Sequence, residues 1–163
     1  MTVKYLVLIE EIRQELEALV EIIAHIEAGL ADYQKADEDN KSYIIDSLAL
    51  SLQSFYTGCE NLFRRIAASV DGELPAGERW HADLLDQMSI ELPEIRPKVI
   101  TEDTKQKLRE LLGFRHTIRN IYIFDIASEP VITLASTVST FLGQLKMDLE
   151  NFSEFLKQVG KDN

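Results

Sequence analysis

The chain has 163 residues, of which 28 are acidic and 17 basic, so its formal net charge is −11 with the three histidines neutral. This length fits one ordinary domain. A content of 45% hydrophobic and 28% charged residues excludes intrinsic disorder. Seven glycines and four prolines are too few for the turns of a β-sandwich or barrel. The negative charge argues against indiscriminate binding to nucleic acid or to an anionic membrane.

The single cysteine, Cys59, excludes an internal disulfide and a cysteine-rich zinc site. The sequence contains no long uncharged apolar run and no signal peptide, so we expect a cytoplasmic protein that does not span a membrane. Acidic residues near the N-terminus lack the histidine spacing of a metal site, and no glycine-rich phosphate loop is present. We therefore expect neither a metal nor another cofactor.

The first two predicted helices are long. Apolar residues spaced by three and four predict a helix from Val3 to about Lys35. The polar stretch of residues 35–40 interrupts this period and supplies capping side chains for a second helix from about Lys41 to Val70. Asp71 and Gly72 should end that helix.

Three further helices are predicted in the second half of the chain. A short helix covers Trp80 to Met88, and residues 90–100 form an extended connection containing two prolines. Thr101 opens a fourth helix that should continue to about Ile126. A fifth starts at residues 128–130, with Pro130 in its first turn. The prediction is an all-α protein, an antiparallel bundle of four long helices plus one short helix, with residues 1–163 in a single domain.

The charge is unevenly placed along the chain. Residues 1–39 hold three basic and ten acidic side chains, whereas residues 96–119 hold seven basic and three acidic ones. A local balance of +4 could admit a phosphate-bearing ligand at the fourth helix. The alternative is a solvated helix face whose basic side chains pair with neighbouring acids.

The segment from Phe114 to Tyr122 is the candidate site. At about 100° per residue, Arg115, Arg119 and Tyr122 fall within about 60° of one another on a helix, and His116 and Asn120 form the adjoining stripe. Guanidinium groups can bind a phosphodiester, an imidazole can transfer a proton near neutral pH, and an amide or phenol can hold a nucleophile or leaving group. Such a set could cleave RNA without a metal, using the 2′-hydroxyl of the RNA as nucleophile.

A structural interpretation competes with this hypothesis. The arginine and histidine of a bundle helix can simply pair with carboxylates of other helices, such as Glu60. Glu60 is expected to face a basic partner, either as a buried structural pair or to orient Arg115 or His116. Trp80 is better explained as a core anchor than as a platform for a nucleic-acid base.

Several motifs resemble the HepT-like branch of the HEPN superfamily. They are Tyr56-Thr57-Gly58-Cys59-Glu60, Gly77-Glu78-Arg79-Trp80-His81 followed by Leu84-Leu85 and Met88, Arg96-Pro97, and Phe114-Arg115-His116 leading to Arg119-Asn120-Ile121-Tyr122. Members are small helical bundles found as ribonuclease toxins beside a minimal nucleotidyltransferase. In the superfamily, an arginine, four to six intervening residues and a histidine form the ribonuclease centre, and HepT toxins add a tyrosine two positions after the histidine.

The resemblance assigns roles to individual residues. Arg115 would bind the scissile phosphate, and Tyr122 would be the hydroxyl that the nucleotidyltransferase modifies with AMP. Independently of the resemblance, Arg119 is expected to supply a second guanidinium for an RNA phosphate. Asn120 stands where the family has its histidine, and an amide cannot act as a general acid or base. His116, one turn earlier, or His81 from the short helix could take over proton transfer.

The leading hypothesis is therefore a HepT-like toxin, a homodimer that cleaves RNA rather than DNA in a groove at the dimer interface and is silenced by a nucleotidyltransferase antitoxin. Phe114, Ile118 and Ile121 offer an apolar stripe for dimerisation. The first alternative is a catalytically silent HEPN module that docks a nucleotidyltransferase or another protein. A weaker one is a purely structural helical dimer.

Overall fold

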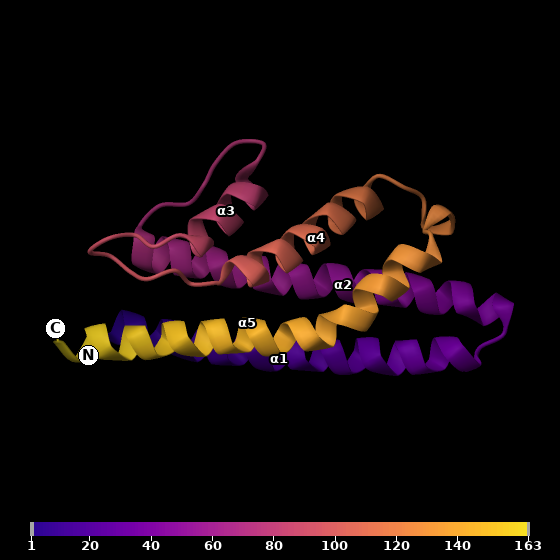
Figure 1. Cartoon of the computed structure of the whole chain (residues 1–163), viewed down its shortest axis with the longest axis horizontal. Coiled ribbons are helices and arrows are strands. Elements are labelled where there is room, and N and C mark those ends of the chain that lie inside the picture. Colours follow the sequence, from indigo (N-terminus) through magenta and orange to yellow (C-terminus); the bar gives the residue numbers. More distant parts are fainter. Residues whose placement is uncertain (1, 163) are drawn as a thin grey trace.

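The fold consists of helices in two groups. In the computed structural model, which describes residues 2–162, three long helices, α1 (Val3–Lys35), α2 (Glu38–Ile66) and α5 (Ser128–Asp162), lie side by side (Figure 1). The shorter helices α3 (Trp80–Ser89) and α4 (Glu102–Arg119) lie on the side of α2 that faces away from α1. The prediction of an all-α helical bundle is confirmed, although its fourth helix is shorter than expected.

The core lies where α1, α2 and α5 meet. The largest buried side chains come mainly from these helices and include Tyr56, Phe55, Phe63, Phe152 and Leu19. Each helix contributes them from one apolar stripe, as the spacing by three and four requires. Within the described residues, no helix combines the length and apolar character needed to cross a membrane.

The ends of α2 follow from local chemistry. The Asp37 side chain accepts a hydrogen bond from the backbone N–H of Asn40 at 2.9 Å, so α2 starts at Glu38 rather than at the predicted Lys41. At its other end, α2 continues as a π-helical turn, η1 (Ala67–Asp71), which ends at Gly72 with a φ of +79°. The predicted stop at Asp71 and Gly72 is confirmed, because glycine adopts this left-handed conformation without a Cβ clash.

The predicted end of the fourth helix is wrong. α4 ends at Arg119, and the short 3₁₀ helix η2 (Ile123–Asp125) follows before α5 begins. The side-chain amide of Asn120 donates to the backbone oxygen of His116 at 2.8 Å, and the backbone N–H of Asn120 instead contacts the Thr117 oxygen. The side chain thus takes the place of the next helical donor, and the α-helical ladder stops.

A buried aspartate attaches the start of α4 to α5. Asp148 accepts hydrogen bonds from the backbone N–H of Thr101 at 2.9 Å and from the Thr104 hydroxyl at 2.6 Å. Thr101 is also the N-cap of α4. Because the carboxylate holds both the cap and the first turn, it fixes where α4 begins relative to the long helices.

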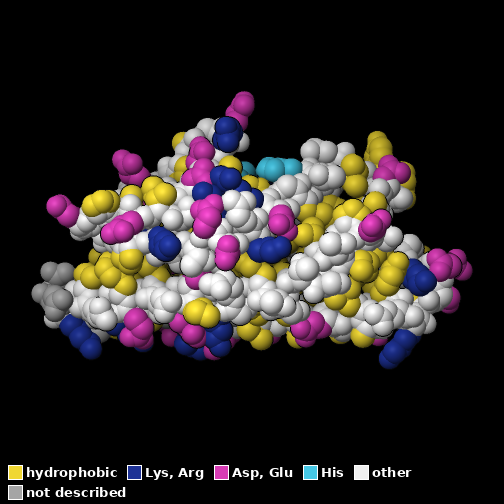
Figure 2. Space-filling model, viewed as in Figure 1, with side chains coloured by type: hydrophobic (Ala, Val, Ile, Leu, Met, Phe, Trp, Pro, Cys, Tyr) yellow, Lys and Arg dark blue, Asp and Glu magenta, His cyan; other side chains and the backbone are white. Residues whose placement is uncertain are grey.

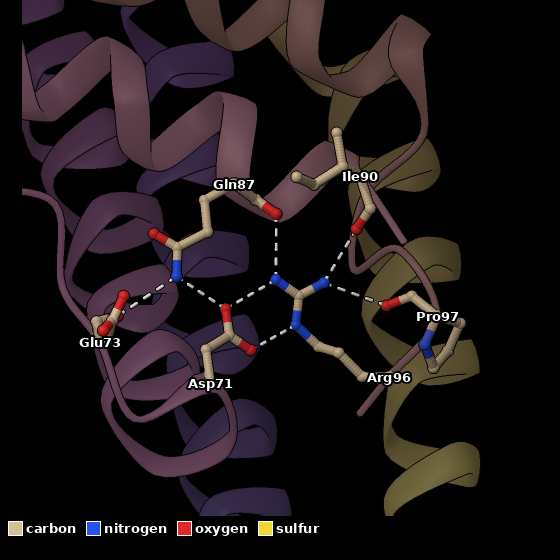
Figure 3. Close-up of polar contacts among 6 residues, drawn as sticks. All are labelled: Asp71, Glu73, Gln87, Ile90, Arg96 and Pro97. Carbon is tan, nitrogen blue, oxygen red and sulfur yellow. Dashed lines mark hydrogen bonds and ion pairs between the residues drawn. The ribbon is translucent and has the colours of Figure 1, made fainter. Parts of the chain in front are cut away.

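A second buried contact fixes the connection between α3 and α4 (Figure 3). The guanidinium of Arg96 donates twice to the Asp71 carboxylate, at 2.5 and 2.7 Å, and also to the backbone oxygens of Gln87, Ile90 and Pro97. These contacts use all five donors of the arginine. They join the end of η1, the last turn of α3 and the following loop at one point.

Replacing Arg96 with methionine should lower the free energy of unfolding by about 3–5 kcal/mol, because Asp71 would stay buried without a cation. Urea denaturation followed by circular dichroism measures this change. The matched control is Lys98→Met, since Lys98 is exposed, and it should change stability by less than about 0.5 kcal/mol. Equal stability of both variants would contradict the structural role of the Arg96–Asp71 pair.

Candidate functional site

The candidate site is built around the buried carboxylate of Glu60. Its Oε1 accepts a hydrogen bond from Nη1 of Arg115 at 3.2 Å, and its Oε2 lies 2.5 Å from Nδ1 of His81. Glu60 comes from α2, His81 from α3 and Arg115 from α4. The prediction that Glu60 faces a basic partner on the fourth helix agrees with this geometry, and His81 is a second partner.

His81, which contacts this carboxylate, lies next to His116. The His81 and His116 rings meet edge to face, with their centroids 5.9 Å apart. A carboxylate only accepts hydrogen bonds, so His81 donates from Nδ1 and keeps its Nε2 for other partners. Figure 2 shows histidine atoms at the surface between α3 and α4, so this part of the cluster is open to solvent. The arrangement can place an imidazole beside an arginine that binds an anion.

Trp80 supports the cluster from the side of α3. Its ring stacks on His81 with centroids 3.7 Å apart, and the Arg64 guanidinium lies 5.3 Å from the ring centroid. Trp80 is partly buried against the core. Side chains of the protein itself therefore contact the ring, which agrees with the core-anchor interpretation and not with a platform for a base.

Tyr56 is the residue of this cluster that sequence reasoning missed. It lies one helical turn before Glu60 and is 1% exposed, and the Arg115 guanidinium carbon is 5.7 Å from its ring centroid. Burial, and then the negative charge of Glu60, raise the pKa of the Tyr56 hydroxyl. The spacing of four residues between Tyr56 and Glu60 was visible in the sequence and places both on one face of α2.

Asn120 and Tyr122 lie apart from this cluster. The Asn120 amide is bonded to the backbone of its own helix, and Tyr122 follows the end of α4. Tyr122 is 72% exposed and stacks on Phe124 with centroids 5.3 Å apart. The predicted helical arrangement of Tyr122 beside Arg115 and Arg119 is wrong, because it assumed that α4 continues. Arg119 itself is exposed in the last turn.

The basic segment of residues 96–119 is largely neutralised within the protein. Arg96 pairs with Asp71 and Arg115 with Glu60, and three more cations pair with acids on α3 or α4: Lys105 and Arg109 with Asp86, and Lys107 with Glu110. This pairing supports the alternative interpretation of the charge pattern. A phosphate would therefore meet Arg115 as one partner of an ion pair, and not as a free cation.

An apolar groove lies between the end of α4 and the start of α5. Its volume is about 740 Å³, and Phe114, Ile118 and Ile121 line it together with Pro130 and Leu134. Phe114, Ile118 and Ile121 are the residues of the apolar stripe predicted for dimerisation. Figure 2 shows hydrophobic side chains gathered on this part of the surface.

Replacing Glu60 with glutamine should lower the free energy of unfolding by about 1–3 kcal/mol, because the partly buried Arg115 and His81 lose a charged acceptor. The control is Glu110→Gln on α4, whose carboxylate pairs with Lys107 but is about half exposed, and its effect should stay below about 0.5 kcal/mol. Chemical denaturation of both variants measures the difference. If Glu60→Gln leaves the free energy of unfolding unchanged, the packing of α2, α3 and α4 does not depend on this carboxylate.

The comparisons with known proteins place this chain in a family. A model of the family described as HepT-like protein matches residues 47–156, which is more than half of the chain and includes Tyr56, Glu60, His81 and Arg115. No curated protein and no solved structure matches the chain significantly. Because the match covers more than half of the chain, the chain belongs to the HepT-like proteins of the HEPN superfamily.

Proposed function

We propose that this protein is the toxin of a prokaryotic toxin–antitoxin pair and cleaves RNA without a metal. The observation that carries the proposal is that Arg115 and His81 both bind Glu60 while His116 lies against His81, inside the region that matches the family. An arginine that binds phosphate and imidazoles that transfer protons are the groups such a reaction needs. We also propose that residues 1–163 form one HEPN domain.

The proposed reaction is an internal transesterification. Arg115 binds the scissile phosphate, and the 2′-oxygen of the RNA attacks phosphorus as the bond to the 5′-oxygen breaks. One imidazole accepts the proton of the 2′-hydroxyl and a protonated group returns one to the 5′-oxygen, which leaves a 2′,3′-cyclic phosphate and a 5′-hydroxyl. His116 is our first candidate for proton transfer because it is exposed, and His81 is the second.

Asn120 and Arg119 take supporting roles in this proposal. Arg119 is exposed one helical turn after Arg115 and can add a second cationic contact to the RNA backbone. Asn120 cannot transfer a proton, and its amide ends α4. We therefore assign Asn120 to shaping the end of the site, although the family pattern has a histidine at this position.

Tyr122 is the proposed site of control by a nucleotidyltransferase antitoxin. The side chain is 72% exposed beyond the end of α4, so an enzyme can reach its hydroxyl. Transfer of AMP would add negative charge and bulk near a site that binds RNA phosphates. The apolar groove beside Ile121 is the proposed contact between two copies of the chain, which would bring their α4 helices into one RNA groove.

A silent binding module is the second candidate function. Two observations favour it, the asparagine at the position of the family's histidine and the ion pair that already occupies Arg115. Such a protein would dock a nucleotidyltransferase or another partner and would not cleave RNA. The absence of cleavage with retained binding of the nucleotidyltransferase would establish this alternative.

Purified protein should cleave single-stranded RNA in the presence of EDTA and leave 2′,3′-cyclic phosphate ends. Arg115→Ala should reduce the rate by at least about 100-fold, and His116→Ala by a similar factor, because one removes phosphate binding and the other proton transfer. Asn120→Ala should have a smaller effect. Arg109→Ala, an exposed arginine on the same helix, is the control and should retain activity. Cleavage that is unaffected by Arg115→Ala would contradict the assignment.

Tyr122 should gain the mass of one AMP when the protein is incubated with ATP and a minimal nucleotidyltransferase encoded beside it. Intact-mass spectrometry of the wild type and of Tyr122→Phe measures this directly. Tyr43→Phe is the matched control, since Tyr43 is equally exposed at 71%. A mass shift that persists in Tyr122→Phe would move the modification to another residue.

A further inference from the structure

The hydroxyl of Tyr56 is an unpaired polar group inside the candidate site. Of the buried side-chain nitrogen and oxygen atoms in the described part of the chain, it is the one without a hydrogen-bond partner. Leaving a buried hydroxyl unpaired costs about 1–3 kcal/mol. Such a group in a folded protein needs an explanation, and its neighbours here are Glu60 and Arg115.

The Glu60 carboxylate is the nearest acceptor that can change its partners. Its two oxygens accept from Arg115 and His81, while a carboxylate has room for about four hydrogen bonds. Glu60 contributes to the raised pKa of Tyr56 through its negative charge and through a weak polar interaction with the hydroxyl, so the hydroxyl lies beside that carboxylate although no regular hydrogen bond joins the two. Tyr56 and Glu60 are also one turn apart on the same helix.

Binding of an anion at Arg115 can remove a hydrogen-bond donor from Glu60, and Tyr56 can supply another. A phosphate that takes the guanidinium away from Glu60 leaves a buried carboxylate with one partner fewer. Removing one partner from a buried ion pair is strongly unfavourable. A replacement donor next to the carboxylate lowers that penalty and so favours the exchange.

We propose that Tyr56 is a positioning residue that donates its hydroxyl proton to Glu60 when Arg115 turns to a phosphate group. In the free protein the hydroxyl makes no regular hydrogen bond and interacts only weakly with Glu60, and in the bound state it forms a full hydrogen bond to the carboxylate that Arg115 has left. The RNA phosphate as ligand rests on the proposed function, whereas the exchange of partners at Glu60 does not. The exchange can therefore be tested without RNA.

The first test is a double-mutant cycle read by thermal unfolding. In the wild-type background, Tyr56→Phe should leave the melting temperature unchanged or raise it, because it removes an unpaired buried hydroxyl. In an Arg115→Met background the hydroxyl can bond to Glu60, so the same substitution should lower the melting temperature by about 2–4 °C. Arg115→Ala repeats the cycle if Arg115→Met does not fold. Tyr43→Phe, on the surface, is the control in both backgrounds.

The second test is binding of an uncleavable RNA, a 2′-O-methyl oligonucleotide, measured by fluorescence anisotropy. Tyr56→Phe should weaken binding about 5–10-fold although the variant is no less stable. The inference would be overturned if Tyr56→Phe destabilised the protein equally in both backgrounds. It would also be overturned if the wild type bound the RNA and Tyr56→Phe bound it equally well. If the wild type binds no RNA, the proposed function fails, and the thermal cycle alone decides the role of Tyr56.

Discussion

The buried carboxylate of Glu60 is the constraint on which the arrangement of the site depends. A carboxylate that is 5% exposed must find hydrogen-bond donors within the protein. Its donors are Arg115 and His81, which come from two helices packed on the outer side of α2. The polar contact that satisfies Glu60 is therefore the same contact that brings a guanidinium and an imidazole together. Packing and site chemistry depend on one side chain.

Two other buried acids hold the frame around Glu60. Asp71 binds Arg96 between η1 and the loop after α3, and Asp148 binds the first turn of α4 from α5. The first contact fixes the end of the helix that carries His81, and the second fixes the start of the helix that carries Arg115. Each of these carboxylates accepts hydrogen bonds on both of its oxygens, so each specifies one geometry for its segment. The end of α3 and the start of α4 are therefore fixed by buried polar contacts.

Much of the fold could be predicted from the sequence, because the helices follow apolar stripes and recognisable caps. The helix expected from Val3 to about Lys35 matches α1, and the predicted starts of α3 and α5 agree with the structure. The predicted end of α4 does not agree, since the Asn120 amide competes with the helix for a backbone oxygen and no periodicity reports this. The contact between Glu60 and Arg115 was foreseen as a possibility. The sequence does not show that His81 shares Glu60 with Arg115, or that the Tyr56 hydroxyl beside them lacks a regular hydrogen bond. Both features arise only when α2, α3 and α4 pack together.

The ion pairs also change what the net charge of −11 means for a phosphate ligand. The positive segment of residues 96–119 is not an open basic surface, because most of its cations are bound to acids of α2, η1, α3 and α4. An anion that binds Arg115 competes with Glu60 for the guanidinium, and long-range attraction contributes little to that exchange. A ligand must therefore fit the local geometry of the guanidinium and the two imidazoles to compete with the internal carboxylate. For the RNA proposed as ligand, this competition would restrict binding to phosphates that reach the guanidinium, and the surrounding negative charge would oppose indiscriminate binding to nucleic acid.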